Sequence, residues 1–408
     1  MLNEETQEKL AELVVDKIEE LNKYIIEEIG KSLLEIGKLT PSKAYQLEQT
    51  IKYGASYNKI IKKIKDITKL NEKEIDNIFK ELAKKNQQWA KVYYDYRGLD
   101  FIPYGQNKAL QNQVNAIAKI TKDTYRNIMQ TSAYSILKGN KTHYTPISKI
   151  YQDVLDEAVI SISQGKETYN QSIRRIMKEL TSKGLRQVDY STGYSRRLDS
   201  SVRMNVLDGM RQLSNEVQRQ FGEEFNADGI EISVHLNPAP DHEEVQGKQF
   251  SHKEYEKLQN GESAKDYKGN IYSLDHDDNG TYRPISTMNC YHYIFSIILG
   301  VNKPQYSDEQ LKQINSKNTK GFDFEGKHYT MYEATQLQRK IETEIRKQKD
   351  IQIGAKSIND IEEIEKSQNK IRKLSQKYKK LSDISGLPYK AKRLAVANYK
   401  RTSIKKLK

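Results

Sequence analysis

The sequence predicts a mainly α-helical protein with a small α+β insert and a long helical, basic C-terminal region. Along most of its 408 residues, apolar side chains recur at steps of three and four, the period of a helix with one buried face. The period changes to two residues near position 230, which is typical of a strand. Hydrophobic residues make up 36% of the chain and charged residues 30%, so much of the helical surface is expected to face solvent.

A chain of this length exceeds a single hydrophobic core, so we expect several domains. Period and composition divide it into an N-terminal helical region at 1–88, a helical core domain at 89–229, a small α+β module with a His/Cys cluster at 230–304, and a helical, basic C-terminal region at 305–408. The single cysteine excludes an internal disulfide and suits a reducing compartment. The longest apolar run, 293–299, is too short for a membrane-spanning helix, so no membrane contact is expected.

The N-terminal region is predicted to be a row of helices. Its first 36 residues carry one apolar stripe, formed by Val14, Ile18, Leu21, Ile25, Ile29, Leu33 and Ile36. Thr40-Pro41 has the pattern of an N-cap followed by proline and predicts a second helix to about Ile67. Asn71 with Glu74 resembles a capping box and predicts a third helix to about Lys85.

Helices also dominate the prediction for the core domain. An aromatic patch at 89–108, broken by Gly98 and Pro103, precedes a helix at about 111–137. Thr145-Pro146 is expected to open the next helix, and a further helix at about 167–182 is expected to end at Gly184 in a left-handed turn. A long amphipathic helix then runs to Phe221. It begins with four arginines that we interpret as ordinary helix surface: Arg196, Arg197, Arg203 and Arg211.

The module at 230–304 is predicted from the change of period. Ile230, Ile232, Val234 and Leu236 alternate with polar residues and indicate a half-buried strand. A short strand at 271–274 interrupts loops rich in Gly, Asn and Asp, and the apolar run at 293–299 predicts a closing strand.

The module also holds the single cysteine and five of the seven histidines of the chain. Cys290 and His292 are two residues apart, which on a strand places both side chains on one face, and His235 and His242 come from the other strand and its loop. These four residues predict a Cys/His site suited to a structural zinc ion, which would stabilise a module with a small core. The alternative is a hydrogen-bonded polar cluster in which Cys290 packs as a small apolar group.

A second chemical interpretation is a metal-dependent nuclease built on Asp275-His276-Asp277, Asn289 and His292. In such a site a histidine activates water and a divalent ion stabilises the leaving oxygen. Asn289 and His292 stand too close together for that pattern, and the apolar run after His292 is strand-like. We therefore favour a protein without catalytic activity.

The C-terminal region is predicted to be one long polar helix over 332–381, followed by a break at Gly386-Leu387-Pro388. Ile364, Ile371 and Tyr378 recur at seven, a short heptad pattern that is compatible with a coiled-coil partner. Residues 366–408 contain 15 Lys/Arg and one acid, a charge of +14, so the other 365 residues sum to −1 in a chain of net charge +13.

This basic arm predicts contact with nucleic acid or an acidic protein surface, with a solvated helix as the alternative. Phosphate contacts by these residues would be sequence-independent and salt-sensitive. The candidate nucleic-acid-binding residues are Lys377, Lys379, Lys380, Lys390, Lys392, Arg393, Lys400 and Arg401.

Several short motifs are spread over roughly residues 90–400. They are Leu198-Asp199-Ser200-Ser201-Val202-Arg203, His235 with His242, Gln246-Gly247-Lys248 before Phe250, Asn289-Cys290-x-His292, and Leu387-Pro388 near the basic end. In content and order they resemble the type 2 minor capsid proteins of tailed bacteriophages, which are related to the Mu F-like head-morphogenesis group. The chain departs from the family pattern at Val245, where tryptophan is favoured, and at Tyr291, where arginine is usual.

The resemblance implies a structural role rather than catalysis. Such proteins are present in few copies per particle, associate with the portal and the inner capsid, and assist head assembly or genome delivery. As partners the resemblance implies the portal protein, the major capsid protein or both, and the basic arm suggests packaged DNA. The implied location is the virion, after assembly in the host cytoplasm. A free nucleic-acid-binding protein is the remaining alternative.

Overall fold

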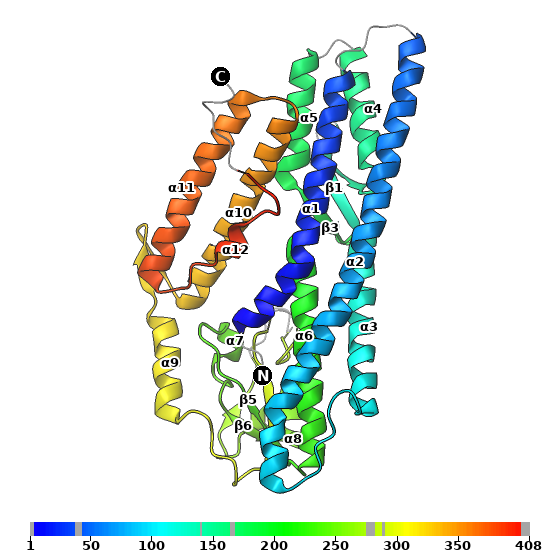
Figure 1. The fold of residues 1–408 in the computed structure, drawn as a ribbon. Coiled ribbons are helices and arrows are strands. Elements are labelled where there is room, and N and C mark those ends of the chain that lie inside the picture. The colour runs from blue at the N-terminus through cyan, green and yellow to red at the C-terminus, as the bar shows by residue number, and fades with distance from the viewer. Residues whose placement is uncertain are drawn as a thin grey trace.

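The computed structural model describes residues 4–36, 43–138, 141–163, 168–274, 282–287 and 290–400, and most of these residues are helical. The strands of the described residues form small antiparallel sheets of two to four strands. Figure 1 shows long helices side by side, a small module at one end, and a helical hairpin along one flank. The predicted fold class, mainly helical with a small α+β part, is confirmed.

Six of the described helices form an elongated bundle (Figure 1). They are α1 (Glu4–Ile36), α2 (Lys43–Arg97), α3 (Lys108–Gln130), α4 (Ile150–Ser163), α5 (Tyr169–Lys183) and α6 (Leu198–Glu224). α1 packs against α2, α4, α5 and α6, and also against α10 (Met331–Ser357) of the C-terminal region. The predicted apolar stripe from Val14 to Leu33 is therefore at most 1% exposed.

The second and third predicted helices are one continuous helix, α2, so the predicted capping box at Asn71 is wrong. Asn71 is fully buried, and its Nδ2 donates to the carbonyl oxygen of Val14 at 3.2 Å and to the hydroxyl of Tyr125 at 3.1 Å. Asparagine favours helix ends because its amide can bond the backbone, but here partners on α1 and α3 use that amide. Thr40-Pro41 lies outside the described residues, and Gly98, at φ +64°, follows the end of α2 as predicted.

A four-stranded sheet in the order β2-β1-β3-β4 belongs to the bundle, and the sequence does not predict it. Its strands are β1 (Ser132–Lys138), β2 (Lys141–Pro146), β3 (Leu185–Val188) and β4 (Ser195–Arg197). The predicted helix to residue 137 is wrong because α3 ends at Gln130, where the hydroxyls of Thr131 and Ser132 donate to carbonyl oxygens of the last turn. Thr145-Pro146 closes β2 instead of opening a helix. α5 ends at Lys183, before Gly184 as expected, but with φ +66° and ψ −171° Gly184 is not in the left-handed helical conformation that was predicted.

The module contains a three-stranded sheet in the order β6-β5-β9, a two-stranded β7-β8 sheet and two short helices. Its elements are β5 (Gly229–Ile232), α7 (Pro240–Glu243), β6 (Gln249–Ser251), α8 (His252–Gln259), β7 (Ala264–Lys265), β8 (Ile271–Tyr272) and β9 (Ile294–Ile297). β9 confirms the predicted closing strand. β5 stops at Ile232 rather than Leu236, because beyond it the hydroxyl of Ser233 accepts the backbone N–H of Tyr293 at 2.8 Å.

The C-terminal region is a hairpin rather than one long helix. Its elements are α9 (Asp308–Lys320), β10 (Phe322–Phe324), β11 (Lys327–Tyr329), α10, α11 (Ile361–Ser385) and α12 (Ala391–Leu394). Asn359, at φ +58°, separates α10 from α11 and lets the chain reverse. Ile364 and Tyr378 of the heptad pattern are buried, because α11 packs on α10 of the same chain.

The buried apolar residues of the described segments form three clusters, one in the bundle, one in the module and one in the C-terminal region. The bundle cluster draws on residues from Ala11 to Phe221 and on a few residues of the C-terminal region. The module cluster lies within 230–294. The division into four parts at 88, 229 and 304 stays a prediction. No described helix combines the length and apolar character that a membrane span requires.

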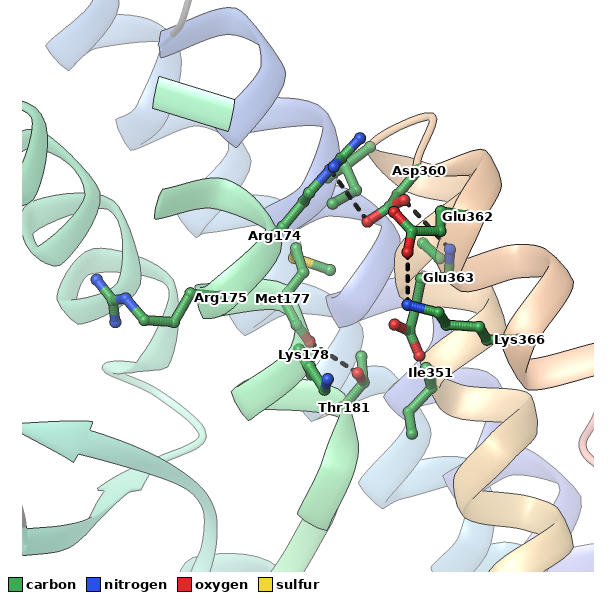
Figure 2. Close-up of a pocket in the computed structure, with 12 residues that line it drawn as sticks. Arg174, Arg175, Met177, Lys178, Thr181, Ile351, Asp360, Glu362, Glu363 and Lys366 are labelled. Atoms are coloured by element: carbon green, nitrogen blue, oxygen red, sulfur yellow. Dashed lines mark hydrogen bonds and ion pairs between the residues drawn. The ribbon is translucent and has the colours of Figure 1, made fainter. Parts of the chain in front are cut away.

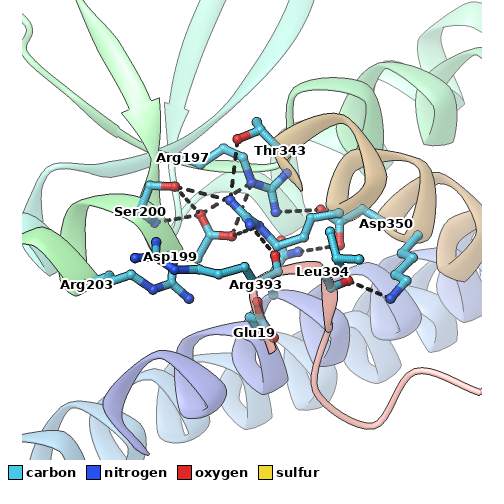
Figure 3. A network of polar contacts seen from close by, with 12 residues as sticks. Glu19, Arg197, Asp199, Ser200, Arg203, Thr343, Asp350, Arg393 and Leu394 are labelled. Carbon is cyan, nitrogen blue, oxygen red and sulfur yellow. Dashed lines mark hydrogen bonds and ion pairs between the residues drawn. The ribbon is translucent and has the colours of Figure 1, made fainter. Parts of the chain in front are cut away.

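Buried charged residues join the bundle to the C-terminal hairpin (Figure 3). Asp199, in the first turn of α6, accepts hydrogen bonds from Arg346 Nε at 2.9 Å and from Arg197 Nε at 3.3 Å. Arg197 Nη2 also donates to Asp350 Oδ2 at 3.0 Å, and the other oxygen of Asp350 accepts from Asn22 of α1 at 3.1 Å. One set of polar contacts therefore connects α1, α6 and α10.

The interpretation of the four arginines as helix surface is wrong for three of them. Arg197, Arg203 and Arg211 are buried. Arg203 forms an ion pair with Glu12 of α1 at 2.8 Å, and Arg211 forms one with Asp208 at 2.7 Å. Periodicity could not reveal this burial, because each of the three also donates to a distant segment of the chain: Arg197 to α10, Arg203 to α1 and Arg211 to the carbonyl oxygen of Cys290. Arg196 is half-buried beside Tyr194.

The same network holds the C-terminal segment 390–397 against α1. Arg346 Nη1 donates to the carbonyl oxygen of Arg393 at 2.6 Å. Arg393 and Lys390 form ion pairs with Glu8 at 2.7 and 3.1 Å. The backbone N–H of Ala397 donates to Glu19 at 2.8 Å. The start of α1 and the end of the described chain are thus linked through polar contacts.

We expect Asp199→Asn to lower the free energy of unfolding by about 3–5 kcal/mol, the usual cost of leaving a buried ion pair without one partner. Burial by itself would raise the pKa of Asp199, but the guanidinium groups of Arg197 and Arg346 outweigh it and hold that pKa well below its usual range. Urea unfolding at neutral pH measures the change. The control is Glu81→Gln, which removes an exposed ion pair with Lys84 and should have little effect; equal effects of the two changes would contradict the assigned role.

Glu19 should make the protein less stable as the pH rises from about 5 to 8. Burial, together with the negative charge of Asp199, raises the pKa of Glu19 to about 8, against the opposing charges of Arg203 and Arg346. A carboxyl whose pKa is higher in the folded state stabilises the fold at low pH and loses that contribution as it ionises, by at most about 1.4 kcal/mol per pH unit.

Glu19→Gln should therefore flatten the decrease of the urea midpoint between pH 5.5 and 8, because glutamine keeps the acceptor for Ala397 but does not ionise. Glu20→Gln, at the neighbouring half-buried position, serves as the control and should keep the wild-type slope. A Glu19→Gln protein with the wild-type slope would show that Glu19 does not cause the dependence.

Candidate functional site

Three of the four predicted metal ligands meet in the module. The side chains of His242, Cys290 and His292 are each at most 2% exposed, and one ligand atom from each lies within 4.8 Å of the others. Cys290 Sγ is 3.4 Å from His242 Nδ1 and 3.4 Å from His292 Nδ1. The sequence prediction of a Cys/His cluster is therefore matched by the positions of these three residues, whereas metal binding itself stays a prediction.

His242 is placed by the short helix α7 and by an ion pair that fixes the segment opposite it. Asp241 forms two hydrogen bonds with the guanidinium of Arg283, at 2.8 and 3.0 Å. The carbonyl oxygen of Arg283 then lies 2.7 Å from His242 Nε2. Because a carbonyl can only accept, Nε2 carries the proton and Nδ1 presents its lone pair toward Cys290.

Cys290 and His292 lie in an irregular segment before β9, so the prediction that they share a strand is wrong. Other contacts hold them in place. Arg211 of α6 donates to the carbonyl oxygen of Cys290 at 2.6 Å. Ser286, at φ +63°, donates its backbone N–H to Cys290 Sγ at 3.2 Å and its hydroxyl to the carbonyl oxygen of His292 at 2.7 Å. The loop around Ser286 therefore orients both residues.

His235 lies beside the cluster, and its ligand atoms are not part of the group of three. Its ring centre is 4.4 Å from that of His292, with the two planes tilted by 55°. Its Nδ1 faces the carbonyl oxygen of Leu236 at 2.8 Å. The structure thus places His235 against His292 as a neighbouring ring.

The short motif Gln246-Gly247-Lys248 connects this cluster to α9. Gln246 Oε1 lies 3.3 Å from His292 Nε2, and Gln246 Nε2 donates to Asn315 of α9 at 2.8 Å. Lys248 forms an ion pair with Asp308 at 3.0 Å. Gly247 has φ +70°, and a Cβ added there would lie 2.6 Å from the side chain of Leu311. All three motif residues therefore contact α9.

Burial sets the protonation of the cluster in the absence of a cation. It lowers the pKa of His242 and lowers that of His292 well below its usual value, with the neighbouring histidines adding to the effect on His292. Burial raises the pKa of the Cys290 thiol, against the N–H groups and arginines that favour the thiolate. Two neutral imidazoles and one thiol thus share a buried site.

The nuclease interpretation required residues that the structure does not describe. Asp275, His276, Asp277 and the motif residue Asn289 lie outside the described residues. His292, the remaining member of that constellation, is buried, with Cys290 at Nδ1 and Gln246 at Nε2. Its side chain is therefore committed to contacts within the protein.

The candidate nucleic-acid-binding residues divide into two groups. Lys379, Lys380, Lys392 and Lys400 are exposed. Lys377 forms an ion pair with Glu325, whereas Lys390 and Arg393 form ion pairs with Glu8. Arg401 lies outside the described residues. The segment 386–400 thus packs partly on the protein body, and exposed positive charge follows the outer face of α11.

A groove of about 180 Å³ between α5 and the α10–α11 hairpin is lined by charged side chains (Figure 2). Arg174 is 3.3 Å from Asp360, and Lys366 forms an ion pair with Glu362 at 2.5 Å. Arg175 points away from the groove and pairs with Glu157. The groove is smaller than the roughly 300 Å³ at which ligand pockets begin, and its charges neutralise one another, so it is not a candidate ligand site.

Several residues that build the Cys/His cluster were not predicted. Arg211, Arg283 and Ser286 come from a helix and an irregular loop, and no period or spacing relates them to the cysteine. Asp241, which immediately precedes His242, was the one local feature of the sequence that could have indicated a cationic residue such as Arg283 near the cluster. A carboxylate next to a buried histidine needs a cation as its partner.

Comparison with known proteins gives a match over nearly the whole chain. The family model described as phage minor capsid protein 2 matches residues 2–383. No curated protein and no solved structure matches the chain. The matched segment includes the helical bundle, the module with its Cys/His cluster, and nearly all of the α10–α11 hairpin.

Proposed function

The chain belongs to the phage minor capsid protein 2 family, and from this membership we propose that it is a structural component of a tailed-phage head that contacts the portal protein, the major capsid protein or both. The match over residues 2–383 is the observation that carries the proposal, because it spans bundle and module together. In this role the protein assists head assembly or genome delivery from the capsid interior or the portal vertex.

The internal framework supports a structural role. Buried ion pairs connect α1, α6 and α10, so the long helices keep one arrangement. The groove between α5 and α11 is too small for an ordinary ligand. Helices joined by buried ion pairs suit a protein whose task is to hold a position between larger neighbours.

The module presents exposed apolar side chains that support a contact surface there. Leu236, Ile271 and Val301 are 72%, 66% and 69% exposed, and Tyr267, which lies against Gly300, is 56% exposed. Tyr267 beside Gly300 and the adjacent Val301 form an exposed apolar site, and exposed apolar sites of this kind commonly take part in protein interfaces. We assign the module end of the molecule as the part that meets the portal or capsid protein.

Co-expression with the portal and major capsid proteins of the same phage should yield a complex that co-purifies with one of them. Ile271→Glu combined with Val301→Glu should weaken that association at least tenfold, because charged side chains would be buried without partners. Leu70→Glu, a control at a 51% exposed position on α2, should retain it. Absence of any association with either protein would contradict the proposed function.

The outer face of α11 supports a contact with packaged DNA. Lys370, Lys373, Lys379 and Lys380 are exposed along this helix, and Arg372 adds to them. Lysines on one surface bind phosphates without regard to sequence and release counterions when they do so. We propose that α11, more than the segment 386–400, carries this contact.

Replacing these four lysines with glutamine should weaken binding to duplex DNA and reduce the slope of log K against log salt by about 3–4, since each phosphate contact contributes about 0.9. Fluorescence anisotropy over a salt series measures both quantities. The matched control replaces Lys59, Lys62, Lys65 and Lys69, which are exposed on α2.

Equal loss of affinity in both quadruple variants would show that DNA binding depends only on the net charge of the protein and not on the lysines of α11. Tight DNA binding without any head partner would favour a free nucleic-acid-binding protein. Cleavage of plasmid DNA with magnesium, manganese or zinc, abolished by His276→Ala, would favour the nuclease and overturn the structural role.

A further inference from the structure

We propose that His242, Cys290 and His292 bind one zinc ion that fixes the irregular part of the module. The proposal rests on the meeting of two imidazole nitrogens and one sulfur at a buried point, each brought there by a different set of contacts. It is independent of the role proposed for the protein in the phage head.

The hydrogen-bonding partners of the two histidines leave both Nδ1 atoms without a proton. His242 Nε2 faces the carbonyl oxygen of Arg283, so the proton is on Nε2. His292 Nε2 faces Gln246 Oε1, and that oxygen is identified by the backbone N–H of His235, which donates to the same atom at 3.2 Å. His292 therefore also carries its proton on Nε2, and both lone pairs point at Cys290.

A single thiol cannot satisfy two such nitrogens. The Cys290 thiol lies 3.4 Å from each Nδ1 and has one proton, which it can donate to only one of them. The other nitrogen would then face sulfur lone pairs inside a buried site, at the cost of an unsatisfied polar group. A cation between the three atoms satisfies both nitrogens and the sulfur at once.

The two sulfur–nitrogen distances are those of a tetrahedral zinc centre. With Zn–S near 2.3 Å and Zn–N near 2.0 Å, tetrahedral angles place sulfur and nitrogen about 3.5 Å apart. The two observed separations of 3.4 Å agree with this value. Two nitrogens and one sulfur are ligands that zinc prefers over magnesium or calcium, which take oxygen.

The surrounding contacts are those that a metal site uses. Metal-binding histidines commonly donate their other N–H to a carbonyl or amide oxygen, as His242 does to Arg283 and His292 does to Gln246. The backbone N–H of Ser286 donates to Cys290 Sγ at 3.2 Å, which stabilises a thiolate. Three protein ligands leave a fourth coordination position to solvent or to a further residue.

Zinc would act here as a crosslink. Among the described residues of the module, eight buried apolar side chains form its cluster, which is a small hydrophobic core. The ion would join α7 to the segment before β9, and through the carbonyl of Arg283 to the loop at 282–287. We therefore expect the metal-bound protein to be more stable than the protein after metal removal.

The test is elemental analysis of the full-length protein purified without added metal, followed by reconstitution of chelator-treated protein with Zn²⁺ or Co²⁺. We expect close to one zinc per chain and a lower melting temperature after chelation. With Co²⁺ we expect a sulfur-to-cobalt charge-transfer band in the near ultraviolet and visible bands typical of tetrahedral cobalt. These measurements on the unmodified protein do not depend on whether any variant folds.

Variants then identify the ligands. Cys290→Ser should abolish the charge-transfer band, and His242→Ala should lower cobalt affinity at least tenfold. His235→Ala and His252→Ala should both keep one metal per chain, since neither residue supplies an atom to the group of three. Metal content far below one per chain, both as purified and after reconstitution, would overturn the proposal, as would an unchanged cobalt spectrum in Cys290→Ser.

Discussion

The buried carboxylate of Asp199 is the constraint on which the arrangement of the helices depends. Moving a carboxylate out of water costs several kcal/mol unless cations and N–H groups surround it. Arg197, Arg346 and the backbone N–H of Ser200, at 2.6 Å, provide those groups. Arg197 and Asp199 flank the start of α6 and Arg346 lies on α10, so the charge is satisfied only when hairpin and bundle are docked. Arg346 also donates to the carbonyl oxygen of Arg393, so the same side chain holds the C-terminal segment against the bundle.

α6 carries this constraint from the bundle to the module. Arg211 lies twelve residues beyond Asp199, about 18 Å along the helix, and donates to the carbonyl oxygen of Cys290. Further along, Asn215 accepts the backbone N–H of Ile294 at 3.3 Å, and the carbonyl oxygen of Gln218 accepts the hydroxyl of Ser296 at 2.8 Å. β9, and with it the segment that bears Cys290 and His292, is therefore held by polar groups of α6 as well as by its pairing with β5.

Helices and strands that follow from a local pattern of apolar residues could be predicted from the sequence. Features that depend on contacts between distant segments mostly could not. The apolar stripe of α1 and the strand β5 follow from period, although β5 is shorter than predicted, and β9 follows from a short apolar run. The bundle sheet was missed because β1 continues the apolar spacing of α3, so the end of the helix is set by hydroxyl groups rather than by period. Three of the four predicted ligands meet, as their types and spacing indicate, but Cys290 and His292 lie in an irregular segment and not on the predicted strand. Burial of Arg197, Arg203 and Arg211 could not be predicted, because their acceptors lie on α1, on α10 and in the module.

Gln246 links the module to α9, because its side chain contacts His235 and His292 of the module and Asn315 of α9. Its Oε1 accepts from the backbone of His235 and faces His292, while its Nε2 is held by Asn315. Asn315 in turn donates to the carbonyl oxygen of Glu243, next to His242, at 2.9 Å. If α9 were displaced, the Gln246 amide that faces His292 would lose its contact with Asn315. The carbonyl oxygen of Glu243, next to His242, would lose its hydrogen bond from Asn315 as well. Gly247 adds a steric reason for the same coupling, since a side chain there would push against Leu311. The short motif around Gln246 thus fixes α9 on the Cys/His cluster.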